Sequence, residues 1–580
     1  MKRKIFQAAL IVLSLLATIK ICFFGLGIDE EYAVTMAYRM AAGDRMFLDM
    51  WEPHQTSGFL AAGLIRLFLA LTGGTDFLVL YLRVAGAVIQ ALIALFLYRT
   101  LKRSFSPDAS FVAAVFFYNT LPKWIQTPEF SNMLVWFSVL AMLCFLRYYL
   151  DRRKKKIWLA AACLSFCGLV LSYPSCILAA PVIALCMWMA DRRSFRTDIC
   201  IAAGTCAAAG ILYVAYFLSH MSVSQFVFGL KQMMTDGAHS AGLPERLQTY
   251  GAELLTLLPH AGIALGLAGL VILLIKRLRS LPVFCLLAIC TAQLAQGIVW
   301  MGSSRYLHFP LVYFYILYGA GLVLYLRKKP ETIRPSLRIL FWMGSMAGGA
   351  VWLSGLLITN TTISVTGSYL MMGLVSAIMI TAESIFGPPR MLSRPDDLTE
   401  PAELTKLPGS ASSFPPGSPP GFLLSALPFL AALCLLGTTL FGKGFMMNEN
   451  EGVKNNITYV RQKALYGPAK GIYYRYMEGY GYNSFALLAP QYIKDGDTVL
   501  YIGQNTLFYV LCGQTISTYS TISTPTFDER LAEYWELHPQ RYPSIVIVDK
   551  GYTGEAKLDH LLKLGEPVAE AEGIVIYSME

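Results

Sequence analysis

Charged residues are scarce in this chain: only 14% of its 580 residues are Asp, Glu, Lys or Arg, against about 25% in soluble domains. Apolar residues make up 55% of the chain, and the mean hydropathy is +0.51. This composition excludes both a single water-soluble globule and an intrinsically disordered chain. Long apolar runs recur from Ile5 to Phe441, so the sequence predicts a polytopic α-helical membrane protein.

The twelve cysteines lack the pattern of a disulfide scaffold or a zinc site. Eleven of them lie inside apolar segments, where a free thiol behaves as a small hydrophobic side chain, and only Cys512 lies in a polar region. No pair has zinc-ligand spacing with His or Asp nearby. The sequence therefore predicts no cofactor and no metal ligand, although a need for a divalent metal stays open.

Basic residues predict the orientation of the chain, because Lys and Arg concentrate in cytoplasmic loops. About thirteen membrane-spanning helices can be assigned within residues 1–441. The apolar segment Thr56–Thr72 is not counted, because it is short, carries Arg66 and ends in two glycines. Without it, every basic cluster falls on the side of the N-terminus, so we expect this segment to be an interfacial or re-entrant helix on the outer face. The net charge of +10 then reflects topology, and a nucleic-acid partner is excluded.

Thirteen crossings from a cytoplasmic N-terminus place the C-terminus outside. Residues 442–580 are thus predicted to form an extracytoplasmic domain. Its β-rich segments at 498–502, 544–548 and 573–577 are separated by helical patterns, which predicts a small α/β fold. No Gly-rich phosphate loop follows the first of these strands.

The remaining residues, 1–441, are predicted to form the transmembrane domain in the cytoplasmic membrane. Two loops stand out within it. Residues 28–76 form an outer-face loop, and residues 387–420, dense in Pro, Ser and Gly, predict a disordered cytoplasmic loop.

Six acidic residues cluster within the outer loop that follows the first helix: Asp29, Glu30, Glu31, Asp44, Asp49 and Glu52. Acids would collect outside merely because bases are kept inside. Here, however, they are interleaved with aromatic residues such as Tyr32 and Trp51 and with His54. That mixture favours a site for polar ligands.

Several features of this loop and of later segments form a recurring pattern. The loop has an acid just past the first helix, a Gly43-Asp44 turn and a Trp51-Glu52-Pro53-His54 stretch before the juxtamembrane helix. Later segments add Arg83 at the start of the next span, Thr127-Pro128-Glu129 at an outer helix end, and Ser304-Arg305-Tyr306-Leu-His308-Phe-Pro310. In these features residues 1–330 resemble the GT-C class of integral-membrane glycosyltransferases, especially bacterial protein mannosyltransferases and the lipid A aminoarabinose transferase.

The sequence departs from the pattern of that class in two places. The first acid is a run, Asp29-Glu30-Glu31, so the resemblance alone does not identify the catalytic carboxylate. His54-Gln55-Thr56 stands where the family often has a Lys-Pro or His-Pro pair.

The resemblance implies an inverting transfer of a sugar from a polyprenyl-phosphate donor to a hydroxyl of a glycan, lipid or protein acceptor, at the outer face among membrane lipids. It implies catalytic roles for Asp29, Glu30 and Glu129, with Asp29 as the base. It implies substrate binding by the following residues: His54, Gln55, Arg83, Arg305, Tyr306 and His308. Such a reaction needs a carboxylate against the attacking hydroxyl and cations against the departing phosphate.

Simpler roles compete with these assignments. Arg83 can extend to the lipid headgroups, Arg305 and Tyr306 can anchor a helix end at the interface, and Glu129 can cap the helix that starts there. The alternative function is a lipid or glycan flippase or transporter without transferase activity. Transporters bury paired ionisable residues within their spans, whereas the spans here are nearly free of charge.

Overall fold

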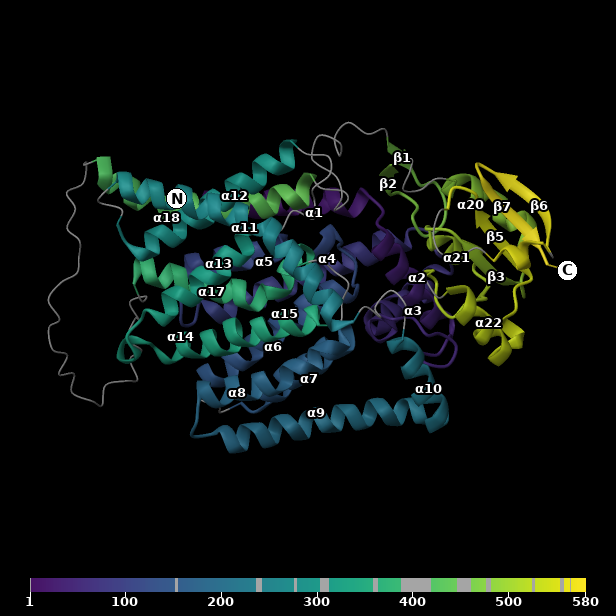
Figure 1. The fold of residues 1–580 in the computed structure, drawn as a ribbon, viewed down its shortest axis with the longest axis horizontal. Coiled ribbons are helices and arrows are strands. Elements are labelled where there is room, and N and C mark those ends of the chain that lie inside the picture. The colour runs from purple at the N-terminus through teal and green to yellow at the C-terminus, as the bar shows by residue number, and fades with distance from the viewer. Residues whose placement is uncertain are drawn as a thin grey trace.

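The computed structural model describes residues 2–579 except 152–154, 236–241, 276–278, 303–311, 358–362, 388–418, 446–460, 476–480, 524–526, 553–557 and 564. A helical bundle forms one part of the molecule, and a smaller domain with a sheet lies at one end of it (Figure 1). Almost all of the predicted loop at 387–420 lies outside the described residues.

The bundle contains most of the helices, in chain order. They are α1 (Lys2–Phe23), α4 (Leu78–Leu101), α5 (Pro107–Asn119), α6 (Phe130–Leu150), α7 (Ile157–Ser172), α8 (Ala180–Ala190), α9 (Phe195–Leu218), α11 (Leu243–Leu274), α12 (Leu281–Gly302), α13 (Val312–Leu326), α14 (Pro335–Leu340), α15 (Ala347–Leu356), α17 (Met371–Phe386) and α18 (Pro419–Phe445). A π-helical turn, Phe341–Met346, joins α14 to α15. Helices α6 and α17 are mostly buried at the centre, whereas few residues of α9, at the edge, are buried.

Eight helices of the described residues are long and apolar enough to cross a membrane, and five more apolar helices are shorter. Together with the sheet-containing C-terminal region, these helices confirm the predicted fold class. The set differs from the predicted spans at two places. It includes Gln55–Thr72, which the charge pattern predicts to lie at the outer interface, and it omits α5, which the sequence predicts to be a span. Length and composition do not decide either case, so the topology stays a prediction.

The predicted outer-face loop is largely helical and lies between the bundle and the C-terminal domain (Figure 1). It contains α2 (Ile28–Ala42), the short helix η1 (Gln55–Gly58) and α3 (Phe59–Thr72). The Arg66 guanidinium on α3 donates to the carbonyl of Met40 at 2.8 Å, near the end of α2, where carbonyls have no partner within the helix. Arg66 therefore serves to hold α3 against α2.

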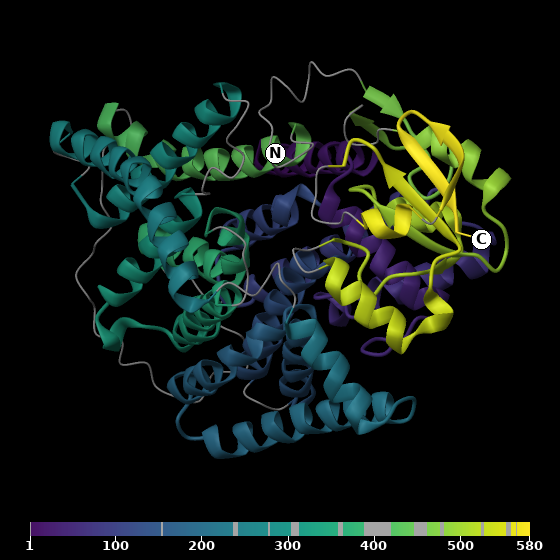
Figure 2. The same ribbon diagram turned by 45° about the vertical axis from the view of Figure 1, so that its right-hand side comes forward.

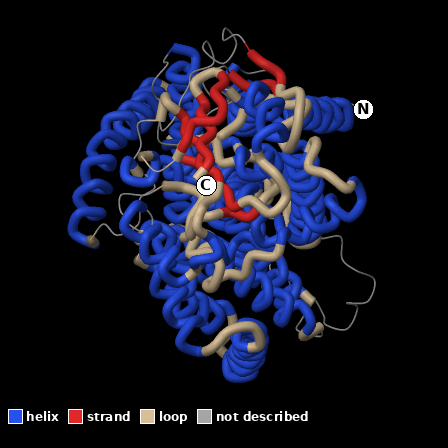
Figure 3. Tube along the Cα trace, turned by 90° about the vertical axis from the view of Figure 1, so that its right-hand side faces the viewer, coloured by secondary structure: helices blue, strands red, loops and turns tan. Residues whose placement is uncertain are grey.

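The C-terminal domain is built on a five-stranded sheet in the order β4-β3-β5-β7-β6. Its elements are β1 (Arg461–Lys463), β2 (Tyr473–Arg475), α20 (Tyr482–Tyr492), β3 (Thr498–Ile502), α21 (Leu507–Cys512), β4 (Thr515–Ile516), α22 (Phe527–Leu537), β5 (Ile545–Asp549), α23 (Asp559–Leu562), β6 (Glu566–Ala571) and β7 (Ile574–Ser578). Strands β4, β3 and β5 are parallel, and β7 is antiparallel to both β5 and β6. Figure 3 views the molecule from the end that carries the C-terminal domain, and there the strands lie in front of the helices.

The sheet domain packs directly on the outer-face loop, residues 28–76. Val34 and Ala37 of α2 share one buried apolar cluster with Tyr501 and Phe508 of the sheet domain. Figure 2 shows α9 leading to the helix α10 (Val223–Met234), which approaches the same domain. There Arg530 of α22 donates to the Gln232 carbonyl at 2.7 Å.

A buried arginine links α2 to the sheet domain. The Arg39 guanidinium contacts the Asp44 carboxylate at 2.8 Å and that of Glu52 at 3.2 Å, and it donates to the Thr518 carbonyl at 2.9 Å. Asp44 also pairs with Arg541 at 2.7 Å. Three of the six clustered acids therefore have structural partners: Asp44 and Glu52 in this network, and Asp49 in an ion pair with Arg45.

Candidate active site

Three of the six clustered acids lie in the first turn of α2: Asp29, Glu30 and Glu31. Helix α1 ends at Phe23 and α2 begins at Ile28. The four-residue connection therefore places these carboxylates directly beyond the end of a membrane helix. The N-terminus of a helix favours negative charge, which explains the position of the acids locally. Their individual surroundings differ, and this difference separates their roles.

Glu30 is buried in an ion pair with Arg83 of α4. The Arg83 Nε donates to Glu30 Oε1 at 2.8 Å, and Nη2 contacts Oε2. The remaining N–H groups donate to the carbonyls of Ile21, Cys22 and Gly25 at 2.6–3.1 Å, where α1 ends and its carbonyls lack partners within the helix. All five guanidinium donors therefore have acceptors within the protein, which gives Arg83 a role in positioning this turn, and its predicted binding of a substrate stays a prediction.

Asp29 forms the second ion pair of this turn, with Lys123. The Lys123 Nζ lies 2.5 Å from Asp29 Oδ2, and the Asp29 side chain is 31% exposed, whereas the partners in the Glu30 pair are almost fully enclosed. Lys123 is held on a strained loop, because both Lys123 and Trp124 adopt positive φ values of 52° and 58°. Such a conformation costs on the order of 1–3 kcal/mol per residue and clusters at functional sites.

Glu129 lies a few residues further on, at the N-cap of α6. Its carboxylate accepts from the backbone N–H of Ser131 at 2.8 Å and of Asn132 at 2.6 Å. Burial raises the pKa of Glu129 to about 7, although Lys123 and these two N–H groups oppose the shift, and Asp29 adds to it. Glu129 and Asp29 therefore both act electrostatically on the same small region around Lys123.

Aromatic rings form one wall of this region. The His54 ring stacks on Phe130, with centroids 4.0 Å apart and planes 7° from parallel, and Tyr173 lies 6.1 Å from it. Lys123 Nζ lies 5.0 Å from the Phe130 centroid. Tyr369 extends the wall, since its hydroxyl is 3.0 Å from Ser131 Oγ. The wall thus connects the outer-face loop to α6 and to the segments that precede α8 and α17.

Several buried polar atoms around this wall have no hydrogen-bond partner among the residues that the structure describes. They are Gln55 Nε2, Thr56 Oγ1, Thr127 Oγ1 and Ser175 Oγ. Each belongs to a residue within two positions of His54, Glu129 or Tyr173. Buried polar groups are nearly always paired, so this cluster indicates a place where a polar ligand or ordered water completes the bonding. Among the described residues, no three His, Cys, Asp or Glu side chains are grouped as a metal site requires.

The structure thus brings Asp29, His54 and Glu129 together, with Gln55 beside them, and pairs Glu30 with Arg83. Arg305, Tyr306 and His308 lie outside the described residues. Lys123 and the aromatic residues Phe130, Tyr173 and Tyr369 were not predicted from the sequence. A signal for Lys123 was present: it is a lone lysine in a loop that the charge pattern assigns to the outer face, where basic residues are disfavoured.

Comparisons with known proteins locate a family resemblance in the first part of the chain. Residues 56–217 match the family described as dolichyl-phosphate-mannose-protein mannosyltransferase. A search of curated proteins gives no match.

Among solved structures, the chain is similar to ArnT from Cupriavidus metallidurans bound to undecaprenyl phosphate, with 12% identity, 99% of this chain and 97% of that chain covered, and a TM-score of 0.41. For ArnT from the same organism in the apo state, the identity is 12%, 100% of this chain and 99% of that chain are covered, and the TM-score is 0.42. The chain is also similar to the archaeal oligosaccharyltransferase AglB from Archaeoglobus fulgidus, in complex with an inhibitory peptide and a dolichol-phosphate. The identity is 14%, 94% of this chain and 70% of that chain are covered, and the TM-score is 0.46. The predicted resemblance to GT-C membrane glycosyltransferases is confirmed by the family match over residues 56–217.

Proposed function

We propose that this protein transfers a sugar from a polyprenyl-phosphate donor to an acceptor hydroxyl at the outer face of the cytoplasmic membrane. The observation that carries the proposal is the pair of acids, Asp29 and Glu129, that both interact with Lys123 beside unpartnered polar groups. A sugar offers hydroxyl groups to such atoms, and a phosphate suits the nearby cation. The similarity of residues 56–217 to a dolichyl-phosphate-mannose-dependent family supports the same class of donor.

In the proposed reaction, Asp29 is the general base. Lys123 holds its Oδ2, and Oδ1 accepts the proton of the acceptor hydroxyl. The acceptor oxygen attacks the anomeric carbon while the bond from that carbon to the phosphate oxygen breaks, so polyprenyl phosphate leaves and the configuration inverts. Because the base is fixed in the first turn of a helix, its position meets the geometric demand of proton transfer.

The other residues take supporting roles in this proposal. Glu30 and Arg83 position the turn that carries Asp29, through their buried pair and the carbonyls at the end of α1. Glu129, His54 and Gln55 orient hydroxyls of the sugar or acceptor. The cation and the hydrogen bonds that hold the donor phosphate come from Arg305, Tyr306 and His308.

The test of the proposed function is a transfer assay on the purified full chain in vesicles. Polyprenyl-phosphate sugars of several types are supplied with membrane extracts that contain glycan, lipid and protein acceptors, and transfer of labelled sugar is measured. Transfer that depends on the chain and releases polyprenyl phosphate supports the proposal. Movement of the intact donor across the vesicle membrane without transfer favours the flippase instead.

The raised pKa of Glu129 leads to a prediction about stability. Its folded-state pKa of about 7 exceeds the ordinary value of 4.5, so the contribution of this group to stability is full below pH 4.5 and is lost as the pH rises through 7. Glu129→Gln removes that loss, because the amide oxygen still caps α6. We expect the variant to be more stable than the wild type by about 3 kcal/mol at pH 8 and nearly equal at pH 4.5, as measured by chemical unfolding in detergent.

The same variant should lose transfer activity, since stability and function conflict at such sites. Glu529→Gln makes the same change at an exposed acid in the first turn of α22. It serves as the control and should show no such gain at pH 8. If Glu129→Gln is no more stable than the wild type at pH 8, the ionised Glu129 carboxylate does not cost the fold stability, which contradicts the prediction.

The topology gives another prediction. Because all basic clusters fall on one side when Thr56–Thr72 does not cross, reporters fused after Gly74 and after Asn450 should both lie outside the cytoplasm. Alkaline phosphatase, active only outside, and a fluorescent protein, active only inside, provide opposite signals at each point. Cytoplasmic fluorescence at either position contradicts the topology and the outer-face site with it.

A further inference from the structure

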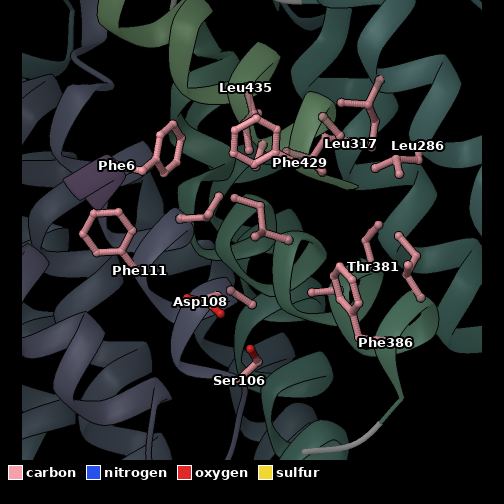
Figure 4. Close-up of a pocket in the computed structure, with 18 of the residues that line it drawn as sticks. Phe6, Ser106, Asp108, Phe111, Leu286, Leu317, Thr381, Phe386, Phe429 and Leu435 are labelled. Atoms are coloured by element: carbon pink, nitrogen blue, oxygen red, sulfur yellow. The ribbon is translucent and has the colours of Figure 1, made fainter. Parts of the chain in front are cut away.

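A cavity of about 770 Å³ lies within the bundle, among α1, α5, α12, α13, α17 and α18 (Figure 4). Most of its lining is apolar and comes from different helices, including Phe6, Phe111, Leu286, Leu317, Ile378 and Phe429. The volume is within the range of ligand-binding pockets in proteins. None of the residues proposed above for catalysis lines it.

The cavity lies at the end of the bundle opposite to the candidate active site. Its polar lining residues include Arg3 and Gln7 in the first turns of α1 and Asp108 at the start of α5. Asp29 follows the end of α1, and Lys123 follows the end of α5. The 22 residues of α1 correspond to about 33 Å of helix, so the two places lie close to opposite faces of a bilayer.

The apolar part of this lining favours hydrocarbon over water. Engineered apolar cavities of about 150 Å³ stay dry and take up apolar ligands. The helices around this one include α1 and α17, which are long and apolar enough to cross a membrane, so the medium beside them is the interior of the bilayer. An acyl chain of a neighbouring lipid is the occupant that this medium supplies.

The polar end of the cavity has one group of each charge at the level expected for a lipid headgroup. Arg3 and Asp108 form an ion pair of 2.6 Å, and their side chains remain 61% and 56% exposed. Gln7 donates to the same Asp108 carboxylate at 3.4 Å. A guanidinium binds phosphate, and a carboxylate beside it binds an ammonium group, so the pair complements a zwitterionic headgroup.

We propose that the cavity binds one acyl chain of a phospholipid whose headgroup carries both a phosphate and a primary ammonium. The lipid fills the space between α18 and the helices α1 and α5, where the rings of Phe6 and Phe429 lie 5.1 Å apart. Since α18 leads into the C-terminal domain, the lipid fixes the helix that connects this domain to the bundle. This site does not depend on the proposed transferase activity.

The test uses the full chain in nanodiscs made from an equal mixture of phosphatidylethanolamine and phosphatidylglycerol. After extraction into mild detergent, retained lipids are counted by native mass spectrometry. We expect the wild type to retain one phosphatidylethanolamine. Ala432→Phe fills the cavity from α18 and should abolish retention, whereas Ala208→Phe at an exposed position of α9 should leave it unchanged.

A second variant tests the headgroup without filling the cavity. Asp108→Asn should lower the preference for phosphatidylethanolamine over phosphatidylglycerol by about fivefold, the effect of one exposed ion pair. A preference for phosphatidylglycerol in the wild type would overturn the proposal, and so would retention by Ala432→Phe equal to that of the wild type.

Discussion

Replacing Asp29 with Asn should lower the turnover of glycosyl transfer by about 100-fold or more while donor binding changes little. The amide keeps the size of the side chain and can still accept from Lys123, but it cannot take the proton of the attacking hydroxyl. The loss therefore appears in kcat rather than in KM. Initial rates in vesicles, at several concentrations of polyprenyl-phosphate sugar, separate the two quantities.

Asp76→Asn is a matched control for this experiment. Asp76 also forms an ion pair with a lysine, Lys470, at 2.6 Å, but it lies at the junction with the C-terminal domain and is largely exposed. The same chemical change there should leave turnover within about twofold, since exposed pairs contribute about 1 kcal/mol or less. Full activity of Asp29→Asn would show that another group is the base.

The second large effect concerns stability. Arg83→Gln should destabilise the fold by about 3–5 kcal/mol, because it leaves the Glu30 carboxylate buried without its charged partner. It also removes donors from the carbonyls of Ile21 and Gly25 at the end of α1. Unfolding of the purified chain by denaturing detergent, followed by circular dichroism, gives the difference from wild type.

Arg103→Gln provides the comparison, since Arg103 pairs with Asp151 at 2.8 Å while its side chain is 46% exposed. We expect a change of about 1 kcal/mol or less there. Combining Arg83→Gln with Glu30→Gln should recover part of the lost stability, because the buried charge is then gone. Equal effects at Arg83 and Arg103 would contradict a structural role for the buried pair.

The position of the three acids of this site could be predicted from the sequence alone. Asp29, Glu30 and Glu31 follow the first apolar run directly, so their place at the start of a helix beyond the membrane was predictable. The strands β3, β5 and β7 match the β-rich segments at 498–502, 544–548 and 573–577 to within one residue, because short runs of β-branched residues specify strands locally. Short motifs also indicated the resemblance to GT-C glycosyltransferases, which the family match over residues 56–217 supports.

The different surroundings of Glu30 and Asp29 are visible only in the tertiary structure. Glu30 meets Arg83 across 53 residues, and Asp29 meets Lys123 across 94. No periodicity within a segment predicts such pairs, since they depend on how α4 and the loop before α6 pack against the end of α1. The sequence by itself determined that this is a membrane protein with acids gathered after its first helix. Packing decided which of them is enclosed by an arginine and which remains accessible beside a lysine, because ion-pair geometry is set by contacts between helices that are distant in the chain.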